Sequence, residues 1–165
     1  MDDKELNNKM EATQVEVTAG FLDMDKVTAT LFLFLKDETI KLLDVETMCN
    51  ERGITPGEMM HKLKARIRKD LNIQGIMFMA EAWMVDTKLE DGVSEEVKDV
   101  LAGNRKPSEC DAKKEALLFS MQTRKGYTRM YKHIITRDIV GRGTLVIDTK
   151  PEELVNGKGN LVNIF

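Results

Sequence analysis

Residues 55–86 read TPGEMMHKLKARIRKDLNIQGIMFMAEAWMVD and carry the clearest helix and strand signals of the chain. Thr55 is a favoured helix N-cap residue, and Pro56 suits the first helical position. Glu58 stands three residues after the cap, which completes a capping-box pattern. Apolar residues then recur at spacings of three and four, at Met60, Leu63, Ile67 and Leu71. The pattern predicts an amphipathic helix that ends near Asn72.

The second half of the stretch predicts a strand, because residues 75–86 form a long apolar run without proline. Side chains alternate between the two faces of a strand. The two expected faces are Met77, Met79, Glu81, Trp83 and Val85 on one side, and Ile76, Phe78, Ala80, Ala82 and Met84 on the other.

Further strand signals lie on both sides of this stretch. Residues 27–35 and 40–45 predict a hairpin before the helix, and residues 116–124 and 127–136 predict a second hairpin after it. A last short strand is expected at 144–148. The order β-β-α-β-(α)-β-β-β predicts an α+β fold. We expect a single, mostly antiparallel sheet of about five to six strands with one main helix packed on a face.

The remaining segments are polar. Residues 1–20 are acidic and predict a flexible N-terminal arm, with a short strand at 14–18. Residues 21–150 are expected to form a single α+β domain. Within it, residues 87–113 form a charged excursion with a short helix from Ser94 to Leu101. Residues 151–165 are expected to be a C-terminal tail.

Composition limits the class of protein. The chain has 165 residues, a formal net charge of -3, two cysteines and two histidines, and the cysteines form no close pair. This pattern argues against a disulfide framework and against a zinc site. No apolar run reaches the roughly 18 residues of a membrane span. The acidic N-terminus does not resemble a signal peptide, so we expect a cytoplasmic protein with no membrane partner and no cofactor.

Glu81 is the foremost candidate for chemistry, because it lies between Met79 and Trp83 on an apolar strand face. A carboxylate in such a place must find a partner or shift its pKa upward. As a perturbed group it could act as an acid, a base or a metal ligand. The structural alternatives are an ion pair with an arginine such as Arg124, Arg129 or Arg137, or a position at an open part of the sheet.

The second late hairpin strand carries further candidates. His133 is in phase with Arg129 and Tyr131, and this mixed face suits the rim of an anionic ligand site. Arg137 and Asp138 follow, and we expect them to pair at the end of the strand. His133 and Asp138 are therefore catalytic candidates next to Glu81. Trp83, Arg129, Tyr131 and Arg137 are binding candidates.

A metal-dependent hydrolase or nuclease would use Glu81 with other acids, such as Asp86, and Lys88. Glu81 and Asp86 are five positions apart and so face opposite sides of a regular strand, which counts against a joint site. A nucleic-acid binder would instead use the basic helix 58–70. Its candidate contacts are Lys62, Arg66 and Lys69. The acidic net charge and the few aromatic residues make this alternative less favoured.

Three short patterns resemble small hypothetical proteins of bacteria and their phages. They are Ala80-Glu81-Ala82-Trp83-Met84, then Pro107-Ser108-Glu109 followed by Lys114-Glu115-Ala116-Leu117, and finally Ile135-Thr136-Arg137-Asp138. The resemblance covers roughly residues 27–148, supports the strand and helix order, and brings no activity with it. It suggests one candidate cluster, made of Glu81, Trp83, Glu109, Glu115, Arg137 and Asp138.

No catalytic constellation stands out, and eleven methionines suit either a core or an adaptable binding surface. We therefore expect a non-enzymatic binding or accessory protein of bacterial or phage origin. It would act through protein–protein contacts or self-association. The hydrolase or nuclease and the nucleic-acid binder are the alternatives.

Overall fold

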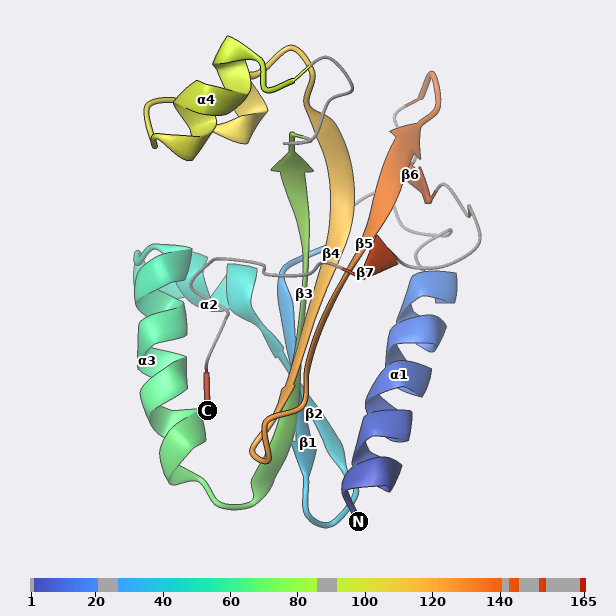
Figure 1. The fold of residues 1–165 in the computed structure, drawn as a ribbon. Helices are drawn as coiled ribbons and strands as arrows, with labels where there is room; N and C mark the ends of the chain where they lie inside the picture. Colours follow the sequence, from blue (N-terminus) through green and yellow to red (C-terminus); the bar gives the residue numbers. More distant parts are fainter. Residues whose placement is uncertain (1, 21–26, 86–91, 141–142, 146–151, 154–163) are drawn as a thin grey trace.

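The computed structural model describes residues 2–20, 27–85, 92–140, 143–145, 152–153 and 164–165. It has an α+β fold, as the sequence predicts (Figure 1). The elements in chain order are α1 (Asp3–Gly20), β1 (Thr30–Leu35), β2 (Ile40–Asp44), α2 (Val45–Arg52), α3 (Pro56–Lys69), β3 (Ile73–Met84), α4 (Glu95–Leu101), the 3-10 helix η2 (Pro107–Glu109), β4 (Lys114–Thr123), β5 (Thr128–Arg137), β6 (Gly143–Leu145) and β7 (Glu152–Glu153).

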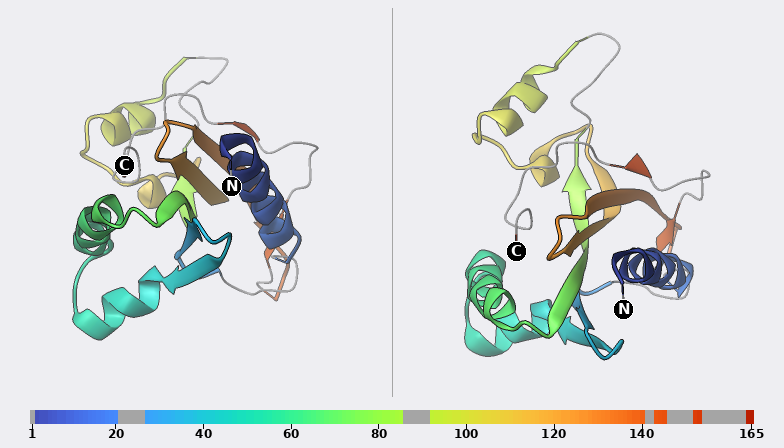
Figure 2. Two further views of the ribbon diagram at one scale, coloured as in Figure 1. Left: turned by 90° about the horizontal axis from the view of Figure 1, so that it is seen from below. Right: turned by 60° about the horizontal axis from the view of Figure 1, so that its bottom comes forward.

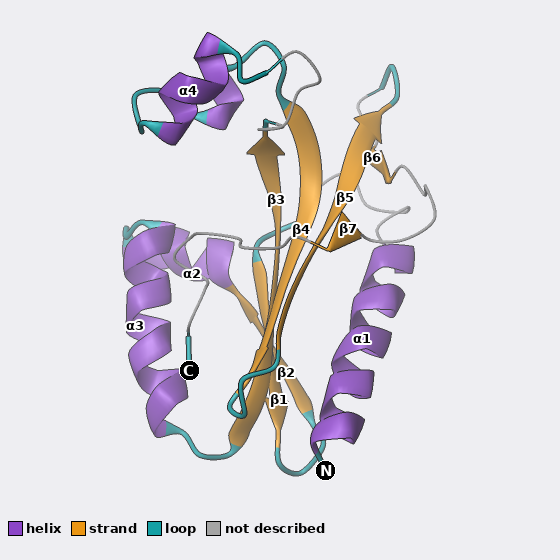
Figure 3. Cartoon of the chain, in the orientation of Figure 1, coloured by secondary structure: helices purple, strands orange, loops and turns teal. Residues whose placement is uncertain are grey.

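The strands form one antiparallel sheet in the order β2-β1-β3-β4-β5-β6, and β7 also pairs with β5. The expected single sheet and its two hairpins are confirmed. The helices differ from the prediction of one main helix on one face. Helix α1 covers one face of the sheet, and α2 and α3 cover the other (Figures 1 and 2). The cartoon coloured by secondary structure shows these three layers (Figure 3).

Helix α3 begins as the sequence predicts. The Thr55 hydroxyl accepts from the Glu58 amide, while the Glu58 carboxylate accepts from the Thr55 amide at 2.9 Å. Its apolar side packs against the face of the sheet that carries Ile73 and Ile76. The buried residues on this helix are Met59, Met60, Leu63 and Ile67, whereas Leu71, expected on the same stripe, is 67% exposed.

Residues 3–20 correct the prediction of a flexible arm with a strand at 14–18, because they form α1. Its start is capped reciprocally: the Asp2 amide donates to Glu5 at 2.7 Å and the Glu5 amide donates to Asp2 at 2.8 Å. The buried residues of α1 are four apart, at Leu6, Met10 and Gln14. One side of the helix therefore docks on the sheet despite its polar composition.

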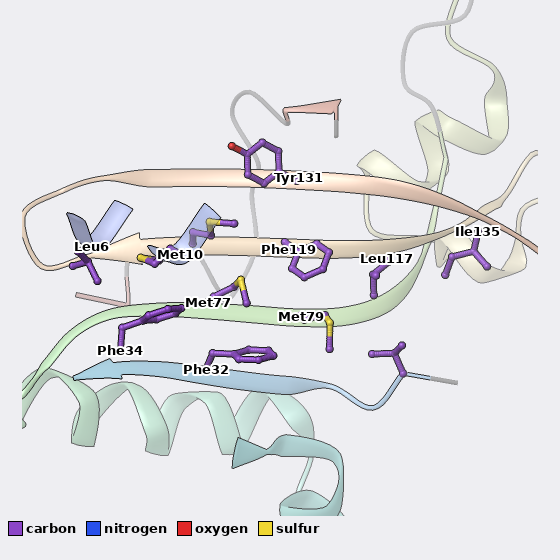
Figure 4. Close-up of a cluster of buried hydrophobic side chains, with 12 residues drawn as sticks. Leu6, Met10, Phe32, Phe34, Met77, Met79, Leu117, Phe119, Tyr131 and Ile135 are labelled. Carbon is purple, nitrogen blue, oxygen red and sulfur yellow. The ribbon is translucent and has the colours of Figure 1, made fainter. Parts of the chain in front are cut away.

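The cluster under α1 is rich in phenylalanine and methionine. Leu6 and Met10 of α1 meet side chains from the four central strands of the sheet (Figure 4). The sheet residues in this cluster include Phe32, Phe34, Met77, Met79, Leu117, Phe119, Tyr131 and Ile135. Methionine thus fills much of this core, in keeping with its flexible, unbranched side chain.

Arg124 connects the sheet with the C-terminal end of helix α3. Its guanidinium donates to the carbonyl oxygens of Ile67 and Asp70, each at 2.7 Å, and its Nε donates to Ile73 at 2.7 Å. The last carbonyls of a helix have no partner within the helix, so this side chain acts as a C-terminal cap from a distant strand.

The excursion between β3 and β4 contains the expected short helix, α4. The Ser94 hydroxyl caps it by accepting from the Val97 amide at 3.3 Å. The expected strand at 144–148 is described only as β6, and its residues 146–148 lie outside the described part, as do Asp86 and Lys88. At the C-terminus, Ile164 is buried in the α3-side core, and its amide donates to Gln122 at 2.8 Å. This residue is therefore packed, although the sequence predicts a tail.

Candidate binding site at the edge of strand β3

Strand β3 extends past the end of its neighbour β1. The pairing with β1 ends at Thr30 and Met79, whereas the pairing with β4 continues to Met84 (Figure 1). Residues 80–84 therefore have β4 on one side. On the other side, no strand within the described residues pairs with them. Within the described part of the chain, residues 80–84 therefore form a free sheet edge on an otherwise central strand.

The backbone direction at this edge follows from one hydrogen bond. The Arg124 amide donates to the Gln74 carbonyl at 3.0 Å, so the even-numbered residues of β3 face β4. Because the direction alternates along a strand, the N–H and C=O groups of Glu81 and Trp83 face the open side. The edge thus presents two donors and two acceptors to any segment that lies along it.

A pocket of about 230 Å³ opens at this edge. It lies where the chain leading into β1 separates from β3. The described residues that line it are Val27, Ala29, Glu46, Ala80, Glu81, Ala82, Trp83 and Glu115. Three of these residues are alanines and three are glutamates.

Glu81 is held by two partners. Its Oε1 accepts from the Val27 amide at 2.9 Å, and its Oε2 accepts from Arg137 at 3.2 Å. Its side chain is 15% exposed. Of the three arginines considered for an ion pair, Arg137 is the one that contacts Glu81. Arg124 instead donates to carbonyl oxygens at the end of α3. The ion pair that the sequence suggested for Glu81 is therefore present, with Arg137 as the partner.

Glu115 on β4 shares the same arginine. Arg137 Nε donates to one Glu115 oxygen at 2.8 Å, and its Nη2 donates to the other at 2.6 Å. This two-point geometry is the strong form of an arginine–carboxylate contact. The hydrogen bond to Glu115 raises the pKa of Arg137, and the charge of Glu81 adds to the effect. The Arg137 guanidinium thus fixes both carboxylates on one face of the sheet.

Trp83 stands at the outer end of this site. It is the chain's single tryptophan and is 45% exposed. Its ring contacts the ammonium group of Lys113, whose Nζ lies 5.2 Å from the ring centre. A half-exposed indole beside a free strand edge provides contact area at little entropic cost.

The structure places three other candidates under α1 and away from this pocket. The hydroxyl of Tyr131 donates to Glu11 of α1 at 2.8 Å, and Arg129 lies over the Tyr127 ring at 5.7 Å. His133 contacts Gln14 and packs edge-on against Phe119, with ring centres 5.9 Å apart. His133, Arg129 and Tyr131 thus belong to the α1–sheet interface and not to the pocket at β3.

The cluster suggested by the resemblance is assembled in part. Glu81, Trp83, Glu115 and Arg137 come together at the ends of β3, β4 and β5. Asp138 instead accepts from the Val140 amide at 3.1 Å in the turn after β5, and Glu109 accepts from the Lys106 amide at 2.9 Å. The basic candidates Lys62, Arg66 and Lys69 are exposed on α3.

Sequence reasoning missed Glu46 and Val27. Glu46 lies in the first turn of α2, and Val27 precedes β1, so neither carries a local signal that connects it with β3. Only the sheet order brings these segments together. Within the described residues, no group of three or more histidine, cysteine, aspartate or glutamate side chains could hold a metal ion. In the same part of the chain, no helix is long and apolar enough to cross a membrane.

Comparisons of this chain with protein-family models, curated proteins and solved structures found no match. The resemblance to bacterial and phage proteins remains a prediction.

Proposed function

We propose that this chain is a non-enzymatic binding protein that takes up an extended segment of another protein at the free edge of β3. The observation that supports this best is the five-residue stretch from Ala80 to Met84, which is paired with β4 on one side only among the described strands. An exposed strand edge is a template for pairing with another chain, and added strands gain affinity from main-chain hydrogen bonds.

The surroundings of the edge suit this role. Proteins commonly protect free edges with lysines, prolines or very short strands. Residues 80–84 contain neither lysine nor proline, and Trp83 within this stretch is 45% exposed. Tryptophan is enriched at the centres of protein interfaces, where it supplies much of the binding energy.

The contacts of Glu81 suit a positioning role. Each of its oxygens accepts a hydrogen bond, one from the backbone amide of Val27 and one from Arg137. The carboxylate thus joins β3 to the segment before β1 and to the end of β5. Glu115 is a second acid near Glu81, but Arg137 binds both carboxylates, and the hydrolase or nuclease alternative remains a prediction.

A peptide selection tests the proposal. The full chain is used to select binders from a phage-displayed library of random heptapeptides, and binding of the selected peptides is measured by calorimetry. We expect enrichment of sequences with extended, alternating character. We also expect them to shift the fluorescence of Trp83, the single tryptophan.

A matched pair of variants locates the binding. Trp83→Ala and Trp83→Pro both remove the indole, but only proline also removes the edge N–H, which does not bond to β4. Trp83→Pro should bind the selected peptides roughly five times more weakly than Trp83→Ala, at similar thermal stability. Equal binding by the two variants, or no enrichment at all, would overturn the proposal. If sedimentation shows a dimer that Trp83→Pro abolishes, the occupant of the edge is a second copy instead.

A further inference from the structure

Ile164 is held between helix α3 and strand β4, on the face of the sheet that α3 covers (Figure 1). Both of its main-chain groups bind side chains of these two elements. Its amide donates to Gln122 Oε1 at 2.8 Å, and its carbonyl oxygen accepts from Arg68 Nε at 2.8 Å. The residue is only 1% exposed, because its side chain packs in the α3-side core.

Phe165 is held by two arginines. The guanidinium carbon of Arg124 lies 4.9 Å from the centre of the phenylalanine ring, which is a favourable contact between a cation and an aromatic face. Arg68 Nη2 also donates to the Phe165 carbonyl oxygen at 3.5 Å. Residues 164–165 are thus bound through main-chain hydrogen bonds and through both side chains. Protein sites that bind short extended segments use this combination.

The three residues that hold this pair, Arg68, Gln122 and Arg124, form what we call the α3–β4 site. Each is positioned by the fold itself. Arg68 lies in the last turn of α3, Gln122 is 4% exposed within β4, and Arg124 also donates to carbonyl oxygens at the end of α3 and the start of β3. Residues 164–165, in contrast, belong to no helix or strand. The site is therefore preorganised, and preorganisation lowers the free-energy cost of binding a segment.

We propose that the α3–β4 site is a second binding site for protein segments, and that residues 164–165 occupy it as a built-in ligand. Its partner is an extended segment of another protein in which an aromatic residue follows a branched aliphatic residue, because this pair fits the site here. The partner's pair takes the place of Ile164 and Phe165. The built-in pair competes at a high local concentration, so it restricts the site to partners that bind tightly.

The proposal goes beyond the binding of a segment at the free edge of β3. Gln122 pairs with Ile76 near the start of β3, whereas the free edge lies at residues 80–84, at the other end of this strand. A second copy of the chain is the less suitable occupant. Exchange of residues 164–165 between two copies replaces each contact by an identical one, while association still costs translational and rotational freedom. A different protein can offset this cost with contacts outside the pair.

Two heptapeptides, blocked at both ends, test the proposal. One has the sequence of residues 159–165, GNLVNIF, and the other, GNLVNFI, has the last two residues in reverse order. Their binding is measured by calorimetry on the full chain with Ile164→Ser and Phe165→Ser, which removes the built-in side chains from the site. We expect GNLVNIF to bind at least about fivefold more tightly than GNLVNFI. Equal binding of the two peptides, or binding of neither, would overturn the proposal.

Arg68→Met and Arg66→Met form a matched pair of variants in this background. Both arginines lie in the last turn of α3 and lose the same charge, but Arg68 donates to Ile164, while Arg66 is exposed. Arg68→Met should weaken binding of GNLVNIF roughly fivefold, and Arg66→Met should leave it unchanged. Equal losses in the two variants would reduce the effect to net charge and count against the α3–β4 site.

Displacement of the built-in pair is measured in the unaltered chain by NMR. Excess GNLVNIF should move the amide signal of Ile164 toward the position of an unstructured residue, and excess GNLVNFI should not. If the double substitution unfolds the chain, as circular dichroism would show, this measurement alone decides. An Ile164 signal that stays in place with both peptides would mean that the pair is a fixed part of the core, and the proposal would fall. A dimer that sedimentation detects and that the double substitution abolishes would make a second copy the occupant, against the proposal.

Discussion

Gln14 of α1 and His133 of β5 are joined by a hydrogen bond, with 2.9 Å between Nε2 of the amide and Nε2 of the imidazole. An amide nitrogen only donates, so His133 Nε2 accepts and the ring is neutral. Burial lowers the pKa of His133. The contact helps to hold α1 on the sheet, and it depends on the histidine being unprotonated.

The pH dependence of stability should therefore report on His133. In the unfolded chain, histidine titrates near pH 6.5, and in the folded chain His133 titrates lower. As the pH falls below about 6.5, the unfolded state takes up more protons than the folded state, so the free energy of unfolding decreases. Urea denaturation at a series of pH values from about 7.5 to about 5 measures this slope. The loss should be smaller in His133→Gln, whose amide can still accept from Gln14.

The other histidine gives the control, because His61 is exposed on α3. His61→Gln should keep the slope of the wild type. If His133→Gln and His61→Gln both follow the wild type over this range, carboxylates and not His133 account for the acid sensitivity.

Removal of Arg137 should destabilise the chain, because Glu81 and Glu115 would then face each other without their shared partner. The arginine is partly exposed, with 27% of its side chain accessible, so solvent screening limits the cost. We expect Arg137→Met to lower the free energy of unfolding by about 1–2 kcal/mol. A double-mutant cycle with Glu115→Gln should give a clear coupling energy, and simple additivity of the two variants would show that the contact contributes nothing.

Arg124→Met should have a larger effect. The substitution keeps much of the apolar stem but removes the donors to Ile67, Asp70 and Ile73, which leaves carbonyls at the end of α3 without this cap. We expect a loss of about 2 kcal/mol and a fall in Tm of roughly 4–8 °C, measured by circular dichroism. Lys125→Met, at an exposed site next in the sequence, should change Tm far less. An unchanged Tm in Arg124→Met would contradict the capping role.

Gly75 is the point of close approach between β3 and α1. A Cβ atom at this position would lie 3.0 Å from Met10 Sδ and 3.4 Å from a methyl carbon of Leu6. The flexible Met10 side chain can yield to one added carbon, but the branched side chain in Gly75→Val would push α1 away. We expect a loss of about 1–3 kcal/mol in urea denaturation and faster amide exchange along α1.

Gly20→Val serves as the control for this substitution, because a Cβ there would meet nothing within 4 Å. It should cost much less than Gly75→Val. If α1 exchanges at the wild-type rate in Gly75→Val, the helix does not depend on this close packing.

The fold was largely predictable where the local signal and the tertiary environment agree. The capping box at Thr55 and Glu58 predicts the start of α3, and the apolar run from residue 75 predicts β3, because both patterns act within one element. Helix α1 was missed for the opposite reason. Only Leu6, Met10 and Gln14 of this helix are buried, so its apolar periodicity is weak. The reciprocal cap between Asp2 and Glu5 is the sequence signal that could have predicted the helix, but in an acidic segment these two residues do not stand out.

For the candidate site, the sequence predicts properties of single residues but not which residues come together. Side-chain alternation puts Glu81 and Trp83 on one face of β3, and the carboxylate's need for a partner follows from its apolar neighbours. That Arg137 is this partner, and that Glu115 shares it, depends on the register of β4 and β5 against β3. The turn between β4 and β5 sets the register of that hairpin. The excursion separates β3 from β4 in the sequence, so no local pattern encodes the register between these two strands.

The α+β class, the antiparallel hairpins and the position of the main helix follow from local periodicity and capping, which can be read along the chain. Two other features depend on how distant segments pack together: β1 ends at Thr30 while β3 continues to Met84, and Glu46 of α2 joins the resulting pocket. A free edge is a difference between the lengths of two neighbouring strands. It exists only once the strands are paired, and this is why the proposed binding site became visible in the folded chain.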